Sequence, residues 1–269
     1  MTGKPIDYLW SFIVGGLTAI FAQIVYQLFI AAGFDPFSLA ITYMLAVLVF
    51  LGAVFAAIEI YQPVEGLAGF GTMSVFSGFA AVITQFSALA LDEGKPFWTA
   101  MYLGSKGPLI LFGIGIPFAF VVALLMKLFH FQPADTTGLT VNVLPHVSVY
   151  IKAFFLGGLF CLFTQFMFRV TKRSVLFILT GAYCVGIVLS ALGCMGLFDV
   201  FGQSGMFMLL YGAGEAIRLG MTSLLNGDPI PLIRYVILCS YCFVFASICG
   251  IILHKRHQAK QGSNSTLSN

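Results

Sequence analysis

Glu215 and Arg218 are two ionisable residues that stand three positions apart in an otherwise apolar stretch of the sequence. Residues three apart on a helix share a face, so these side chains are placed to pair. A charged side chain at the centre of a membrane helix costs about 2.5–3.5 kcal/mol, and such residues often mark a solute path. A guanidinium also matches the geometry of a carboxylate. The pattern predicts either a contact between Arg218 and an anionic solute or a structural ion pair with Glu215.

Other polar side chains also lie in or beside apolar stretches. Gln23 and Gln165 are expected to form hydrogen bonds between helices, with contact to a solute as the alternative. Lys106 stands just before an apolar stretch, so it is expected at the mouth of a solute path or snorkelling at the membrane interface. The remaining pore candidates are small residues from two segments rich in Gly, Ser and Thr: Gly69, Gly71, Ser74, Ser77 and Gly205.

The sequence predicts no metal, no cofactor and no enzyme. Cys239 and Cys242 have C-x-x-C spacing, but no second Cys or His pair follows at metal-site spacing. Glu59, Glu65 and Asp199 are expected to be solvated, although carboxylates also suit a divalent cation such as calcium. Hydrolase, zinc-protease and phosphate-loop motifs do not occur. Surface exposure is expected for the four histidines: His130, His146, His254 and His257.

The composition is that of an integral membrane protein. Of the 269 residues, 59% are hydrophobic and only 9% are charged, whereas soluble domains carry about 25% charged residues. Lipid must therefore cover the surface that charge does not. Most of the stretches without Asp, Glu, Lys or Arg reach the roughly 20 residues that a membrane span needs. These stretches are Tyr8–Phe34, Ser38–Ile58, Gly66–Leu91, Gly107–Met126, Ser174–Phe198 and Tyr235–Leu253.

The chain contains an internal repeat. The pattern F-x-x-G-G-L at Phe12–Leu17 recurs at Phe154–Leu159, at an offset of 142 positions that also relates Gln23 to Gln165. Further along, Glu65, Gly71 and Gly78 correspond at an offset of 134 to Asp199, Gly205 and Gly212. Two matches in the same order indicate a tandem duplication. The predicted units are a first membrane repeat (1–135), a linker (136–147), a second membrane repeat (148–254) and a polar tail (255–269).

The Gly-rich segments Gly66–Leu91 and Val200–Leu225 decide the topology. If both cross the membrane, the basic residues divide evenly between its two sides. If both re-enter and leave on the same side, nine basic residues face the cytoplasm and three or four face outward, which satisfies the positive-inside rule. The second arrangement gives six spans, with both termini in the cytoplasm. Ordinary tightly packed helices are the alternative for the two segments.

Three spans in each repeat is an odd number, so the repeats would insert with opposite orientations. The predicted fold is therefore all-α and integral to the membrane, with two inverted three-span repeats that each contain a Gly-rich re-entrant or broken helical segment. Inverted repeats commonly place a solute site near the midplane where the halves meet. Irregular backbone at that depth must be buried in protein or line a water-filled cavity. The Gly-rich segments are thus the expected pore elements.

The first half resembles a known family. Tyr61-Gln62-Pro63, followed by Ala68–Gly71 and Gly78-Phe79, is similar to the Y-x-P, A-G-x-G and G-F signature of the stage V sporulation protein A membrane subunits, of the AC and AE types. The resemblance covers nearly all of the first half and, more weakly, the second. The chain departs from the family by fusing two units, by Val75 in place of proline, and by Gln62 where an acidic residue is common.

The resemblance implies a subunit of a membrane channel for a small anionic solute of the dipicolinic acid type. We therefore expect a multi-pass protein of the bacterial inner membrane that contacts the lipid bilayer. It is expected to form homo- or hetero-oligomers with related membrane subunits, with a soluble cytoplasmic protein as a further partner and with no nucleic acid. The alternative is a non-conducting scaffold or receptor that docks a soluble partner through the basic loop Arg169–Arg173. For a channel, Gln23, Gln165, Ser74, Ser77 and Arg218 should converge on one cavity.

Overall fold

The computed structural model describes residues 5–36, 38–131 and 146–267, and all regular elements within these ranges are helical. The first half contains α1 (Pro5–Ala31), α2 (Leu39–Ala57), α3 (Tyr61–Ala68), the 3₁₀ helix η1 (Gly69–Ser74), α4 (Phe76–Asp92) and α5 (Phe97–Leu128). The second half contains α6 (Val147–Thr171), α7 (Val175–Ala191), α8 (Met195–Gly202), α9 (Ser204–Phe207), α10 (Leu210–Leu225) and α11 (Ile230–Leu267). The predicted all-α class is confirmed.

Five described helices are long and apolar enough to cross a membrane: α1, α2, α5, α6 and α11. The helix α7 is also apolar but has only 17 residues. Large apolar side chains point outward from these helices, for example Leu28, Phe177 and Ile237, each more than 60% exposed. An apolar exterior of this extent requires contact with lipid rather than water. The chain is therefore an integral membrane protein.

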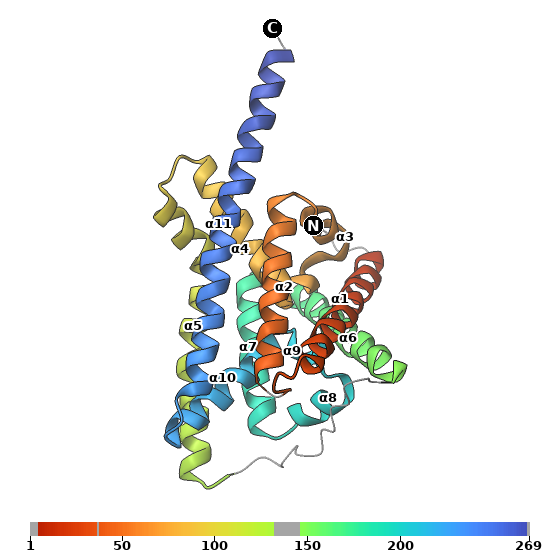
Figure 1. Ribbon diagram of the computed structural model, residues 1–269, viewed down its shortest axis with the longest axis vertical. Coiled ribbons are helices and arrows are strands. Elements are labelled where there is room, and N and C mark those ends of the chain that lie inside the picture. Colours follow the sequence, from red (N-terminus) through yellow and green to blue (C-terminus); the bar gives the residue numbers. More distant parts are fainter. Residues whose placement is uncertain (1–4, 37, 132–145, 268–269) are drawn as a thin grey trace.

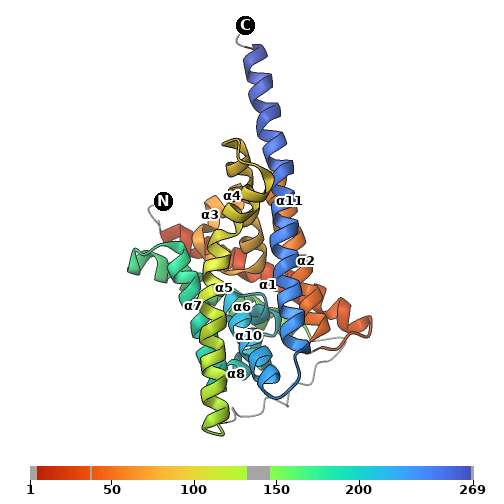
Figure 2. The same cartoon turned by 90° about the vertical axis from the view of Figure 1, so that its left-hand side faces the viewer.

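The helices α1 and α6 cross on one side of the molecule, while α5 and α11 run along its length on the other side (Figures 1 and 2). The crossing is formed by the paired glycines of the repeated motif. A Cβ atom added to Gly15 would lie 2.6 Å from the Cys161 sulfur, and one added to Gly158 would lie 2.7 Å from the Phe12 carbonyl oxygen. Small residues at these positions let the two helix backbones approach each other closely.

The segment α3–η1–α4 begins and ends on the same side of the molecule. Glu59, which precedes α3, and Asp92, which ends α4, both contact the ring of His257 on α11. The segment α8–α9–α10 lies in the opposite half: in Figure 1, α8 and the end of α10 are near the lower end, whereas α3 and the end of α4 are near the upper end. Each segment therefore reaches the centre of the molecule and turns back.

The two segments are broken at corresponding positions, and the breaks meet. Gly69 and Gln203, which are 134 positions apart, both have positive φ angles, of 66° and 40°. Val75 and Leu209, also 134 positions apart, are both extended and form an antiparallel β-bridge. The Phe76 amide donates to the Met208 carbonyl oxygen at 3.0 Å. This contact joins the starts of α4 and α10 at the centre of the protein.

The helices of the structure begin and end at other positions than the predicted segments. The turning segments begin at Tyr61 and Met195 rather than at Gly66 and Val200, because short helices containing Glu65 and Asp199 lead into them. The predicted polar tail 255–269 continues α11 as a helix through Leu267. Lys, Gln and Ala favour helix, and polar composition alone does not end one. The predicted linker 136–147 lies outside the described residues, except for His146 and for Val147, which begins α6.

Candidate functional site

A cavity of about 670 Å³ lies between α2, α10 and α11. Its inner end is formed by Phe76, the first residue of α4, and by Phe207 beside the second break. Its polar lining consists of Ser38, Thr42, Asp199, Glu215, Ser223, Arg234 and Tyr235. Leucine, isoleucine and phenylalanine side chains form most of the remaining wall. A concave, mostly apolar space with a few polar groups is the usual form of a small-molecule site.

Two acidic side chains share one wall of this cavity. Asp199 from α8 is 7% exposed, and its carboxyl group lies close to that of Glu215 on α10. The second carboxyl oxygen of Asp199, Oδ1, is buried and has no hydrogen-bond partner. Arg234 at the start of α11 also lines the cavity, where its guanidinium donates to the Ser38 hydroxyl. The wall thus carries both signs of charge.

Arg218 lies behind this wall and is only 4% exposed. Its Nε atom donates to the Ser190 hydroxyl at 2.8 Å, and Ser190 donates to Glu215 Oε1 at 3.2 Å. The direct Glu215–Arg218 pair expected from the sequence is therefore replaced by a chain through Ser190. The geometry of α10 places the two residues near each other, but the hydroxyl from α7 takes the position between them.

Gln23 and Gln165 each support the broken segment of the other half of the chain. Gln165 on α6 accepts a hydrogen bond from the Gly71 amide at 3.1 Å. Gln23 on α1 accepts one from the Ser204 amide at 3.1 Å and donates to Gln203 at 2.7 Å. A broken helix leaves backbone groups unpaired, and these amides satisfy them inside the protein. Of the two predicted roles, hydrogen bonding between helices is the one observed.

The remaining candidates occupy tight packing positions or the outer surface. Ser74 donates to the Gly71 carbonyl oxygen at 2.7 Å, and Ser77 forms a hydrogen bond with Tyr61. Gly205 and Gly69 pack against Ala153 and Gln165, respectively. Lys106 is an exposed residue within α5 and lies away from the cavity lining. Glu215 alone among the ten pore candidates lines the cavity.

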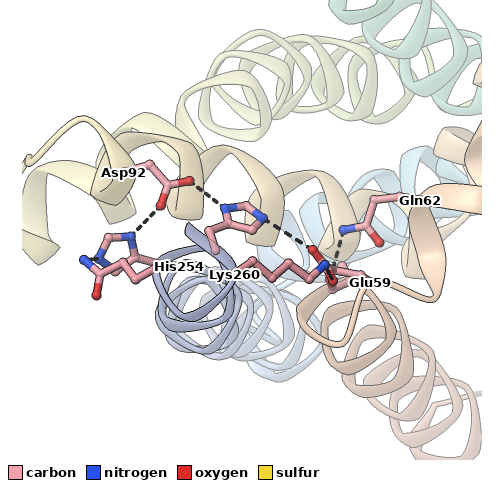
Figure 3. Close-up of polar contacts among 8 residues, drawn as sticks. Glu59, Gln62, Asp92, His254 and Lys260 are labelled. Atoms are coloured by element: carbon pink, nitrogen blue, oxygen red, sulfur yellow. Dashed lines mark hydrogen bonds and ion pairs between the residues drawn. The ribbon is translucent and has the colours of Figure 1, made fainter. Parts of the chain in front are cut away.

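A second polar cluster joins α11 to the ends of α2 and α4 (Figure 3). Asp92 contacts His254 at 2.6 Å and His257 at 2.7 Å, and Lys260 pairs with Glu59. Hydrogen bonding from Lys260 holds the pKa of Glu59 below its ordinary value. Desolvation raises the pKa of Asp92, whereas hydrogen bonds from His257 and His254 lower it. The hydrogen bonds have the larger combined effect, so the pKa of Asp92 lies below its ordinary value. The cluster fixes the ends of the first turning segment.

Sequence reasoning identified Glu215 but missed Asp199 and this cluster. Asp199 had been expected as a solvated residue, and His254 and His257 as exposed tail residues. The spacing of His254 and His257 places both on one helix face, which is the signal that could have indicated a shared partner. For Asp199, the available signal was its match to Glu65 at the 134 offset. Glu65 also meets a polar group of the returning helix, since Gln85 donates to its carboxylate at 3.0 Å.

The helices, the apolar exterior and the turning segments define a multi-span α-helical membrane protein. Residues 7–125 match the SpoVAC/SpoVAEB sporulation membrane protein family, in agreement with the resemblance seen in the sequence of the first half. The match runs from the start of α1 almost to the end of α5 and includes the first turning segment. No curated protein and no solved structure matches the chain.

Proposed function

We propose that the protein is a solute-conducting membrane subunit, a channel or facilitator for a small anionic solute of the dipicolinic acid type. The observation that carries this proposal is the cavity of about 670 Å³, which extends from Ser38 and Arg234 to Phe76 at the centre of the protein. Ligand sites commonly have volumes of about 300–1,000 Å³. The family that the first half matches supports a membrane role connected with sporulation.

The inner end of the cavity favours negative charge. Phe76 begins α4, and Gly212 and Ala213 lie in the first turn of α10, so the cavity reaches the amino-terminal parts of two helices. The amino terminus of a helix carries a partial positive charge and attracts anions, as in transporters with broken helices. Arg234 adds a guanidinium that matches a carboxylate. The acidic pair belongs to the same cavity lining, and Arg218 behind it offsets one of its two negative charges.

The same proposal includes an inverted tandem duplication. The first half has the long apolar helices α1, α2 and α5, the second half has α6, α11 and the shorter apolar helix α7, and each half has one turning segment. Equivalent turns have equivalent backbone. Glu59 and Gly193 are 134 positions apart and both have positive φ, as do Gly69 and Gln203. Gly94 and Gly227 have positive φ at an offset of 133. A fused pair of units would supply in one chain what related proteins supply as two subunits.

We place the protein in the bacterial inner membrane with both termini in the cytoplasm. In this orientation the cytoplasmic end carries Lys95 and the basic residues in the last part of α11 (Lys255, Arg256 and Lys260), while Lys127, Lys152 and Arg234 face outward. Assembly with related membrane subunits, and with a soluble cytoplasmic partner, is part of the proposal. The alternative scaffold role is less favoured because Arg169 and Arg173 of the expected docking loop already stack on Tyr8 and Phe177.

Dipicolinate flux through the purified full-length chain in liposomes tests the proposal. Ala216 is an exposed residue of α10 that lines the cavity, so Ala216→Trp should fill it and reduce flux at least tenfold. Ile237→Trp adds similar bulk to the 62% exposed outer face of α11 and should leave flux unchanged. Absence of flux from folded wild-type protein would overturn the conducting role in favour of the scaffold. Equal flux through both variants would exclude this cavity as the path.

A further inference from the structure

The acidic wall of the cavity carries two groups that can be negative, Asp199 and Glu215, and one positive group, Arg218, linked to them. Asp199 and Glu215 are both carboxyl side chains, and Arg218 reaches them through Ser190. Full ionisation of both acids would leave one uncompensated negative charge in a low-dielectric region, which is strongly unfavourable. A bound proton or another cation must supply the missing positive charge.

The contacts favour a proton. Asp199 and Glu215 both line the cavity and lie close to each other, so a proton shared by the pair removes the repulsion between two adjacent negative charges. The Asp199 oxygen Oδ1 is buried on the cavity wall and has no hydrogen-bond partner. Asp199 as a whole is only 7% exposed. An unpaired acceptor at this position points to a ligand that donates a hydrogen bond. Water is such a donor, and it can also take up a proton that the pair releases.

We infer that Asp199 and Glu215 form a proton-binding site that exchanges one proton with the cavity. On release, the O–H bond of the protonated carboxyl breaks, the proton passes to water in the cavity, and the pair changes from one negative charge to two. Uptake reverses the step. The pair would thereby set the charge of the wall that a solute meets. The site does not depend on which solute the cavity takes.

Charged and titratable groups on the neighbouring helices are held by other partners. Tyr26 of α1 lies near Asp199 and Asp35, and its hydroxyl donates to the Pro36 carbonyl oxygen. The other groups of this kind near the cavity are Lys152 over the Phe201 ring, Lys127 on the Leu225 carbonyl, Arg234 on Ser38, and Tyr235 with Tyr183. Arg218 is thus the cation linked to the pair among the described residues.

Proton counting on the full-length protein in detergent tests this inference. Asp199→Asn and Glu215→Gln keep the shape of the protonated pair but lack the exchangeable proton. Titration of each variant against wild type between pH 5 and pH 9 should therefore show about one fewer proton released per chain. Glu65→Gln, at the equivalent position of the first half, should release as many protons as wild type in this range.

Labelling with dicyclohexylcarbodiimide supplies an independent measurement, since this reagent modifies protonated carboxyl groups in apolar surroundings. Mass spectrometry should find the label on Asp199 or Glu215, with less label as the pH rises, and none on Glu65. Equal proton release by wild type and both variants, with neither acid labelled, would overturn the inference. Protection from labelling by sodium or calcium at constant pH would also overturn it, by showing that a metal cation occupies the site. Neither measurement requires solute flux, so the outcome is separate from that of the proposed function.

Discussion

The side chain of Gln165 accepts a hydrogen bond from the backbone amide of Gly71 at 3.1 Å, although the two residues belong to different halves of the chain. Gln23 makes the reciprocal contact with the Ser204 amide. The halves are therefore not two modules placed side by side. Each supplies a side chain that completes the broken segment of the other.

Replacing Gln165 with leucine should lower the free energy of unfolding by about 1–3 kcal/mol, because the Gly71 amide would be buried without a partner. Thermal unfolding of the purified protein in detergent measures the effect. Gln27 is the matched control, since it is equally buried in α1 and both its amide atoms lack partners. Gln27→Leu should therefore be neutral or stabilising. Equal losses in the two variants would contradict the supporting role of Gln165.

Gly71→Ala should disrupt the centre of the fold. A Cβ atom at this position would lie 2.4 Å from the Cys161 carbonyl oxygen, and backbone of α6 cannot move aside cheaply. We expect a loss of folded protein corresponding to roughly 1–3 kcal/mol or more, as for other overpacked sites. Gly113→Ala, in a helix with nothing within 4 Å of the added atom, is the control and should be tolerated. Monodisperse protein after size-exclusion chromatography gives the comparison.

Arg218→Gln should reduce the yield of folded protein rather than the flux of each folded molecule. Arg218 is buried, it supports Glu215 through Ser190, and it lies outside the cavity lining. Removing one member of a buried charged network costs on the order of 3 kcal/mol. Arg173→Gln, on the exposed surface, should have little effect on yield. Normal yield with lost flux would instead return Arg218 to the permeation path that the sequence suggested.

The cluster at the end of α11 should contribute stability that depends on pH. The pKa values of Glu59 and Asp92 lie below their ordinary values of 4.5 and 3.8, so the folded state favours the ionised carboxylates. Their contribution is fully present above the unfolded-state values and is lost as the pH falls through the lower folded-state values. The difference in thermal stability between wild type and Asp92→Asn should therefore be largest near neutral pH and vanish in acid. Exposed Glu93→Gln should show no comparable difference.

The apolar stretches predicted the helices and the membrane class, because a helix that crosses the lipid must be apolar over about 20 consecutive residues. The glycine-rich segments were located from the repeat and the distribution of basic residues. The partners of Gln23, Gln165 and Arg218 could not be predicted, since each contact joins helices that are distant in sequence. Asp199 was misplaced for the same reason: its role depends on Glu215 and on a cavity formed by three helices. The helix in the polar tail could not be predicted from composition, because polar residues also form helices. Here a contact between Lys260 and Glu59 holds part of this helix in place.

The reciprocal glutamines also impose an order on biosynthesis. When the first turning segment leaves the ribosome, its Gly71 amide has no partner, because Gln165 is still to be translated. An unsatisfied buried amide is costly, so the segment 61–92 gains its full set of hydrogen bonds only when α6 packs against it. The first turning segment is therefore completed by a residue that is translated 94 positions after Gly71.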